Sequence, residues 1–228
     1  MSIYTSGEYL AHNPTWHAED SPWKARQIIS LLRANHLTPD SVCEVGCGAG
    51  EIIRCMASDS PNSDFVGYDI SPQAISRAQD KAGANLSYIE GDALASGTHY
   101  DLAMAIDVLE HVDDYIGFAR KVKTLADYKI YHIPLDMSVQ VLLRVRKLKD
   151  LREEIGHLHY FSRETALATL AYTEHQIIDC RYTPGAIELA PKSILQQVAN
   201  ILRRILFPLA PHLTVRLLGG FSLLVLCK

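Results

Sequence analysis

Residues 42–50, Val-Cys-Glu-Val-Gly-Cys-Gly-Ala-Gly, decide the fold of this 228-residue chain. Val42–Val45 is apolar apart from Glu44 and predicts a strand, and Glu51–Ala57 predicts a helix directly after the glycines. Glycines between a strand and a helix allow a sharp turn and let a ligand approach the backbone where a Cβ would collide. The helix N-terminus that follows offers free N–H groups to an anion. A nucleotide phosphate and an amino-acid carboxylate would both suit this turn.

Outward from the turn, residues 41–134 alternate short apolar runs with longer segments of helical pattern. Strands separated by helices of this length predict repeated βαβ units and a mostly parallel sheet. The expected strands after the first are Phe65–Tyr68, Leu86–Ile89, Leu102–Ile106 and Lys129–Ile133. The expected helices are Pro72 to about Ala82, capped by Ser71, and a segment near Asp113–Leu125.

The flanking segments are less regular. A first helix is expected at Pro22–Leu32, and two late strands at Gln176–Cys180 and Phe221–Cys227. The remaining expected helices are Val139–Ile155, Arg163 to about Ala171 with Ser162 as its cap, and Lys192–Leu206. Because the length suits one domain, we expect a single domain over 1–228. It would comprise an N-terminal segment (1–40), a cofactor-binding half (41–134) and an acceptor-binding half (135–228) with inserted helices.

Acidic side chains follow three successive strands. Asp69 lies 19 residues after Gly50, where a carboxylate can accept both hydroxyls of an adenosine ribose. Asp92 follows the third strand and can accept from an exocyclic adenine amine. The segment Asp107–His111 follows the fourth. Because the carboxyl ends of such strands face one crevice, these groups together predict a pocket for an adenosine with an anionic tail.

Four segments in this order resemble the successive motifs of class I S-adenosylmethionine-dependent methyltransferases, closest to the small-molecule, ubiquinone-biosynthesis-like group. They are residues 42–50, Val66-Gly-Tyr-Asp-Ile-Ser-Pro72, Gly91-Asp92 and Asp107-Val-Leu-Glu-His111. The resemblance covers residues 41–134. It implies a Rossmann-like, doubly wound seven-stranded sheet that is mostly parallel with an antiparallel last strand, and S-adenosylmethionine as the cofactor.

The resemblance also implies roles for individual residues. The three turn glycines would line the methionine moiety, Asp69 would hold the ribose, Asp92 and Ala93 would meet the adenine, and Asp107 would lie beside the transferred methyl. The full set of expected cofactor-binding residues is Glu44, Gly46, Cys47, Gly48, Gly50, Asp69, Ile70, Asp92, Ala93, Asp107, Val108, His111, Trp16 and Lys24.

The N-terminal stretch Tyr9–Lys24 holds both tryptophans of the chain, Trp16 and Trp23. In related enzymes such a segment covers the cofactor as a lid. Aromatic faces there could stabilise a sulfonium cation and exclude water, and Lys24 could meet the methionine carboxylate. The alternative is that the tryptophans pack the first helix onto the sheet.

Methyl transfer from a sulfonium needs mainly the alignment of nucleophile, methyl and sulfur, and a base helps when the nucleophile is a hydroxyl or protonated amine. The candidate bases are His132, His157 and His159. For His157 the alternative is that it only pins a loop to the following helix start. No metal is expected, because His157-x-His159 is a two-ligand fragment without an obvious partner.

The charge balance, 22 Lys and Arg against 26 Asp and Glu, argues against a dedicated nucleic-acid binder. Five irregularly spaced cysteines and an N-terminus without a signal pattern favour the cytoplasm. The expected partner is a small-molecule acceptor, with a hydrophobic acceptor as one option. Three roles are open for the basic helices Val139–Ile155 and Lys192–Leu206. They would cover that acceptor, rest on an anionic membrane, or pack on the rest of the protein with their charged faces in solvent. A non-catalytic adenosyl-ligand binder or partner subunit and an NAD-dependent oxidoreductase remain as alternatives, and the oligomeric state is open.

Overall fold

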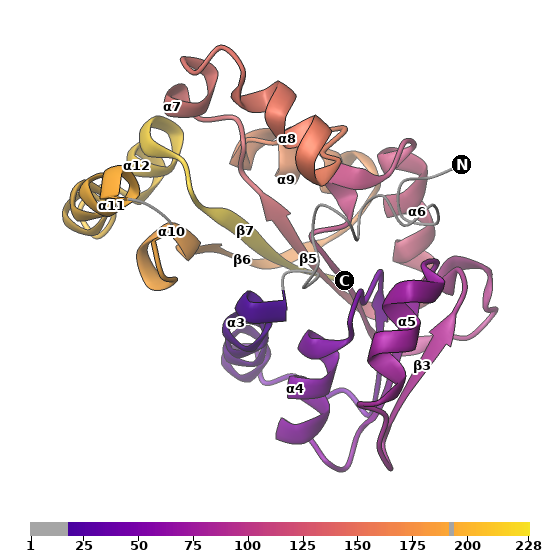
Figure 1. Ribbon diagram of the computed structural model, residues 1–228. Helices are drawn as coiled ribbons and strands as arrows, with labels where there is room; N and C mark the ends of the chain where they lie inside the picture. Colours follow the sequence, from indigo (N-terminus) through magenta and orange to yellow (C-terminus); the bar gives the residue numbers. More distant parts are fainter. Residues whose placement is uncertain (1–17, 192–193) are drawn as a thin grey trace.

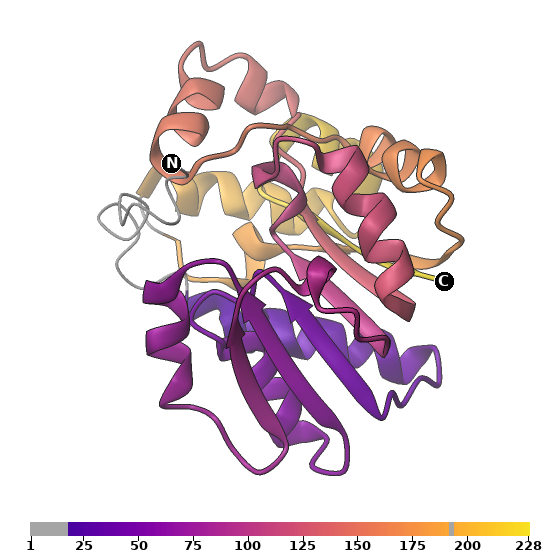
Figure 2. The same cartoon turned by 90° about the vertical axis from the view of Figure 1, so that its right-hand side faces the viewer.

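The computed structural model describes residues 18–191 and 194–228, in which a seven-stranded sheet has helices on both faces (Figures 1 and 2). The strand order is β3-β2-β1-β4-β5-β7-β6. All neighbouring strands are parallel except β7, which runs antiparallel to both β5 and β6. The strands are β1 Ser41–Val45, β2 Asp64–Asp69, β3 Leu86–Glu90, β4 Tyr100–Ile106, β5 Ala126–Pro134, β6 Ile177–Thr183 and β7 Ser222–Cys227. The fold class expected from the sequence is confirmed.

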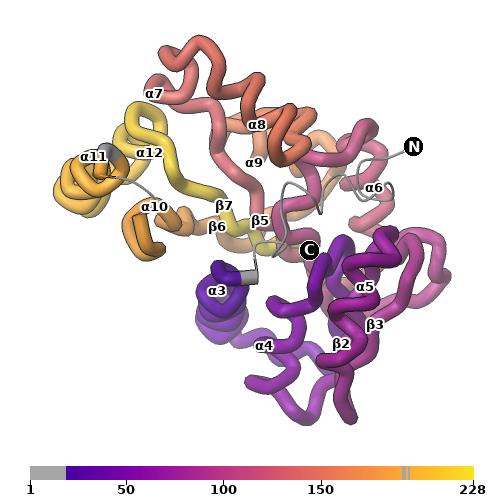
Figure 3. Tube along the Cα trace, in the orientation of Figure 1, coloured from indigo at the N-terminus to yellow at the C-terminus, as the bar shows by residue number. Residues whose placement is uncertain are grey.

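The helices form the two outer layers. They are α3 Ser21–Ala34, α4 Glu51–Asp59, α5 Pro72–Gln79, α6 Tyr115–Leu125, α7 Val139–Leu142, α8 Lys147–Ile155, α9 Arg163–Tyr172, α10 Gly185–Glu188, α11 Ile194–Leu206 and α12 Pro211–Leu218. Short 3-10 turns are η1 Ala18–Asp20, η2 Ala93–Ala95 and η3 Leu109–His111. The helices α11 and α12 lie at the opposite end of the molecule from α5 and β3 (Figure 3).

Two hydrophobic cores follow from the alternation of side chains along the strands. In β4, Leu102 and Met104 pack on the face covered by α3, α4 and α5, whereas Ala103 and Ala105 pack on the face covered by α6 and α9. Every side chain from Leu102 to Ile106 is therefore buried. This two-sided burial explains why the central strands appear in the sequence as continuous apolar runs.

Two serine caps predicted from the sequence are present. The Ser71 hydroxyl accepts from the Ala74 N–H at the start of α5, and Ser162 forms a reciprocal capping box with Thr165 at the start of α9. The helix α5 ends at Gln79, earlier than the expected Ala82, because the chain then turns through i→i−3 hydrogen bonds at Lys81 and Ala82.

The single helix expected over Val139–Ile155 is wrong, because the chain forms α7 and α8 with a break between them. The break is held by i→i−3 hydrogen bonds, from Arg144 N to Val141 O and from Lys147 N to Arg144 O. A continuous helix would have placed Val145 on the same face as Val141, whereas here the Val145 side chain is 98% exposed. Helices α10 and α12 were not predicted.

Candidate cofactor and acceptor site

A cavity of about 1020 Å³ opens at the carboxyl ends of β1, β2 and β4. This is the edge at which ligands bind in open α/β sheets. Nearly all the described residues expected to bind cofactor line it: Lys24, Glu44, Gly46, Cys47, Gly48, Asp69, Ile70, Asp92, Ala93, Asp107, Val108 and His111. Gly50 does not line it, and Trp16 lies outside the described residues.

The glycine turn between β1 and α4 is held in a left-handed conformation, with φ of +72° at Gly46, +54° at Gly48 and +75° at Gly50. The N–H groups of Gly46 and Cys47 both donate to the Tyr68 carbonyl, which ties the turn to the end of β2. A Cβ on Gly50 would lie 2.3 Å from the Tyr88 ring. Gly50 therefore packs against Tyr88 and does not line the cavity, whereas Gly46, Cys47 and Gly48 do.

Glu44 places a carboxyl with one unpaired oxygen beside the turn. Its side chain is 1% exposed, and among the described residues its Oε2 has no hydrogen-bond partner. Burial raises the pKa of Glu44 to about 8. A buried acceptor without a partner costs free energy, so this atom fits a ligand that donates hydrogen bonds, such as the ammonium of an amino acid. The turn and Glu44 together fit the methionine end of S-adenosylmethionine.

Asp69 is the last residue of β2, and its carboxylate accepts two backbone hydrogen bonds. The N–H of Gly48 donates to Oδ2 and the N–H of Ser71 donates to Oδ1, each at 2.8 Å. Burial raises its pKa although these hydrogen bonds oppose the shift. The next side chain, Ile70, is apolar, 51% exposed and part of the cavity wall, so it offers a surface for a flat ring. Asp92 Oδ1 accepts a hydrogen bond from Leu94 N and so caps the N-terminus of η2.

Asp107 follows β4 with a φ of +54°, a left-handed backbone that non-glycine residues adopt at a cost. Its Oδ2 lies 2.6 Å from Lys24 Nζ, and its Oδ1 lies 2.5 Å from His132 Nδ1. Burial alone would raise the pKa of Asp107, but the contacts of its carboxylate with His132 and Lys24 hold that pKa well below its usual range. The ionised carboxylate of Asp107 therefore links Lys24 of α3 to His132 near the end of β5. On its other side, His132 Nε2 lies 2.8 Å from the Thr183 hydroxyl.

The first helix, α3, carries Trp23, which lines the cavity and contacts α10. Trp23 is 7% exposed, and its indole N–H donates to Glu188 Oε2 of α10 at 2.6 Å. Lys24, one residue further along α3, reaches the cavity but binds Asp107. The part of the expected lid before residue 18 lies outside the described residues.

The three candidate bases have different surroundings. His132 and His157 line the cavity, whereas His159 does not. His159 Nε2 lies within hydrogen-bonding distance of the carbonyls of Val112 and Asp113, which accept its proton. The His157 Nδ1 lies 2.7 Å from Asp136 Oδ2.

Sequence reasoning missed the partners that surround His157. Glu110, for which the sequence predicted no separate role, is fully buried, and it lies with His111 and His157 in one cluster. Asp136 and Thr183 also went unnamed. The one local signal was an acidic residue and a histidine, Glu110 and His111, next to each other at a strand end.

Taken together, the sheet order and the cavity define a Rossmann-like α/β protein with a site for an adenosyl ligand. Residues 17–171 match the family model described as a methyltransferase domain. The chain belongs to this family, and the recognition of a class I S-adenosylmethionine-dependent methyltransferase from its motifs is confirmed.

Individual relatives agree with the family. The chain is 28% identical over 130 residues to the ubiquinone biosynthesis O-methyltransferase of Nitrosospira multiformis, covering 51% of this chain and 53% of that protein. It is 32% identical over 68 residues to the malonyl-[acyl-carrier protein] O-methyltransferase of Neorickettsia risticii, covering 29% and 27%. The chain thus spans about half or less of the length of these curated relatives.

The fold also matches solved structures. Magnesium protoporphyrin IX methyltransferase from Synechocystis, solved with bound SAH, superposes with a TM-score of 0.61 at 18% identity, covering 91% of this chain and 82% of that one. This likeness is one of fold. Within residues 18–191 and 194–228, every helix is too short or too polar to cross a membrane.

Proposed function

We propose that this protein transfers the methyl group of S-adenosylmethionine to a small-molecule acceptor and releases S-adenosylhomocysteine. One observation carries the proposal: a single cavity is lined both by the glycine turn and Asp69 and by Asp107, His132 and His157. Cofactor-type groups and candidate bases therefore share one space, which a purely structural role would not require. An oxygen nucleophile is the first choice, because both curated relatives above are O-methyltransferases.

The cofactor, when bound, supplies a sulfonium methyl that a nucleophile can displace. Asp69 would accept the ribose hydroxyls, Asp92 and Ala93 would meet the adenine, and Glu44 would accept from the methionine ammonium. The salt bridge from Lys24 to Asp107 joins α3 to the end of β4, and both residues line the cavity. These residues bind and align, which supplies much of the acceleration in such a displacement.

His132 is the base that the geometry favours. Asp107 accepts the Nδ1 proton, so the neutral ring carries its lone pair on Nε2, next to the Thr183 hydroxyl. A proton from the acceptor could then reach Nε2 directly or through that hydroxyl. This arrangement predicts that His132→Ala slows turnover most at low pH, where the acceptor is least ionised.

The test is transfer of a labelled methyl group from S-adenosylmethionine to a panel of small hydroxyl, amine and carbon acids, apolar ones included. We expect labelled product with the wild type and none with Asp69→Ala. The acidic side chain of Glu90 is the register partner of Asp69 on β3 but does not line the cavity, so Glu90→Ala is the matched control and keeps full activity. Binding of S-adenosylhomocysteine without transfer to any acceptor would favour the non-catalytic binder.

We also propose that the face formed by α11 and the α7–α8 connection rests on an anionic membrane. The helix α11 buries polar residues, Asn200 and Arg203, and exposes apolar ones. The exposed apolar side chains of this face are Leu143, Val145, Ile194, Val198, Ile201, Leu202 and Ile205. Arg144, Arg146 and Lys147 alternate with or follow Leu143 and Val145 in the α7–α8 connection and the start of α8, and such a mixture suits anionic lipid headgroups.

Co-sedimentation with anionic vesicles tests this contact. The wild type should bind vesicles containing phosphatidylserine, and Val198→Asp with Ile201→Asp should not. Both substitutions are at exposed positions, so the fold should be retained. Equal binding of both forms, or a concentration-dependent dimer that the substitutions abolish in the absence of lipid, would contradict the membrane assignment.

A further inference from the structure

One cluster in the cavity wall is not explained by cofactor binding. It joins η3 to the loop between α8 and α9, two segments that are 47 residues apart at Glu110 and His157. The N–H groups of Leu158 and His159 both donate to the Glu110 carbonyl, at 2.8 and 3.1 Å. The loop is therefore fixed on η3, and the rings of His111 and His157 meet edge to face with centroids 4.9 Å apart.

The carboxyl group of Glu110 is the unusual member of the cluster. Its side chain is completely buried, and among the described residues neither Oε1 nor Oε2 has a hydrogen-bond partner. Burial, together with the negative charge of Asp107, raises its pKa well above the usual range. A buried carboxyl without partners is costly, and hydrogen bonds that only pin the loop would not require one.

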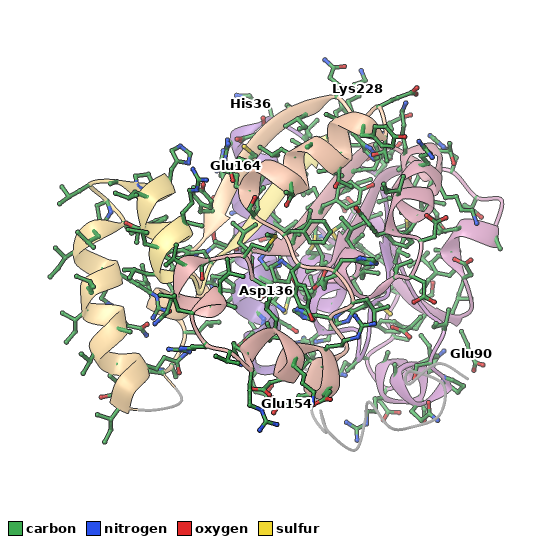
Figure 4. All side chains as sticks on the ribbon, turned by 90° about the horizontal axis from the view of Figure 1, so that it is seen from above. His36, Glu90, Asp136, Glu154, Glu164 and Lys228 are labelled. Atoms are coloured by element: carbon green, nitrogen blue, oxygen red, sulfur yellow. The ribbon has the colours of Figure 1, made fainter. Side chains whose placement is uncertain are left out.

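Both histidines are oriented by an acceptor at Nδ1. The His157 Nδ1 lies 2.7 Å from Asp136 Oδ2, and the His111 Nδ1 lies 3.0 Å from the Gly156 carbonyl. With the ring proton on Nδ1, the lone pair of each neutral ring is on Nε2, and His111 Nε2 lies 3.8 Å from Glu110 Oε1. Metal-binding histidines usually donate their second N–H to a carboxylate or carbonyl in this way. Figure 4 places Asp136 in the middle of the molecule as seen from above.

We propose that Glu110, His111 and His157 bind a divalent transition-metal ion. One ligand atom from each residue lies within 4.8 Å of the others. Ligand bonds of about 2.1 Å at tetrahedral angles put two ligand atoms about 3.4 Å apart, so side-chain movements of about 1 Å complete the site. Two imidazoles and one carboxylate favour Zn²⁺ or Mn²⁺ over Mg²⁺ and Ca²⁺, which prefer oxygen ligands.

The position of the ion suggests what it does. All three ligands line the cavity, and three protein ligands leave coordination positions open. An acceptor oxygen bound there would lose its proton more readily, because a divalent ion stabilises the oxyanion. This catalytic part rests on the proposed methyl transfer, whereas metal binding itself does not.

The experiment titrates Zn²⁺ into chelator-treated protein by calorimetry, at a pH where histidine is neutral. We expect one ion per chain. Glu110→Gln, which keeps the shape of the side chain, should weaken binding at least about 100-fold, and Asp136→Asn should weaken it about 10- to 100-fold. His159→Ala is the matched control, since His159 lies in the same loop but binds backbone carbonyls, and its affinity should equal that of the wild type.

Two further readouts separate the possible failures. Co²⁺ absorption bands of the wild-type protein report nitrogen and oxygen ligands without any substitution, so they test the site even if a variant does not fold. S-adenosylhomocysteine binding is measured on the same variants and should be retained. Absence of a stoichiometric site, or Zn²⁺ affinity that Glu110→Gln leaves unchanged, overturns the metal proposal while leaving methyl transfer intact. Loss of S-adenosylhomocysteine binding by the wild type counts against the proposed function instead.

Discussion

Of the substitutions Gly50→Ala, Gly97→Ala and Gly83→Ala, we expect Gly50→Ala to lower the free energy of unfolding most. At Gly50 φ is +75°, and an added Cβ would lie 2.3 Å from Cε1 of Tyr88. The Tyr88 ring is 5% exposed, and its hydroxyl donates to the Gly50 carbonyl at 2.8 Å, so the ring cannot move without losing that bond. A left-handed backbone costs an alanine about 1–2 kcal/mol, and overpacking costs a further ~1–3 kcal/mol. We therefore expect a loss of about 2–5 kcal/mol in the free energy of unfolding.

Two other glycines separate these contributions. Gly97 also has a positive φ, +70°, but its Cβ would meet none of the described residues within 4 Å. Gly97→Ala should therefore cost only the backbone strain, about 1–2 kcal/mol. Gly83 has neither feature, and Gly83→Ala should be neutral or stabilise by up to about 1 kcal/mol through the unfolded state.

The assay is urea unfolding followed by circular dichroism, with S-adenosylhomocysteine binding measured on each folded variant. In a Tyr88→Ala background, the cost of Gly50→Ala should fall to that of Gly97→Ala, because the collision is gone. A Gly50→Ala variant as stable as Gly97→Ala would refute this reasoning.

Three further predictions concern charged groups. The pKa of Asp107 is lowered in the folded state, so its contribution to stability is present above the unfolded pKa and is lost as the pH falls. In urea titrations the free energy of unfolding of Asp107→Asn should therefore fall less steeply than that of the wild type below about pH 4. The pKa of Glu44 is raised to about 8, so the wild type loses stability as the pH rises from about 4 toward 8, and Glu44→Gln should be the more stable form at pH 8 in the same titration. Arg203 donates to Gly219 O, Asn200 Oδ1, Gln140 Oε1 and Leu218 O, so Arg203→Ala should cost about 2–4 kcal/mol by thermal or urea unfolding.

The strands and their order along the chain could be predicted because the central sheet is buried on both faces. Each predicted strand from β1 to β5 lies within the observed one, and the glycine and acidic residues at the strand ends marked the cavity. These signals are local: apolar runs, a serine before a helix, a glycine after a strand.

The C-terminal third could be predicted less well because its structure depends on distant contacts. Arg203 is buried in α11 since the carbonyls at the end of α12 and the Gln140 side chain accept its hydrogen bonds, and the apolar face of α11 is left outside. An amphipathic pattern alone predicts the reverse orientation. The cluster at Glu110 was missed for the same reason, because His157 reaches it only through the loop after α8.

Calorimetric titration of S-adenosylhomocysteine tests the central claim most directly, because it needs no knowledge of the acceptor. We predict one molecule bound per chain, binding at least about 100-fold weaker in Asp69→Ala, and unchanged affinity in the neighbouring Glu90→Ala. Glu90 ends β3 opposite Asp69 but outside the cavity, so the pair differs in position and not in charge. No binding by the wild type, or equal affinity in Asp69→Ala, would contradict the assignment of this cavity as the cofactor site.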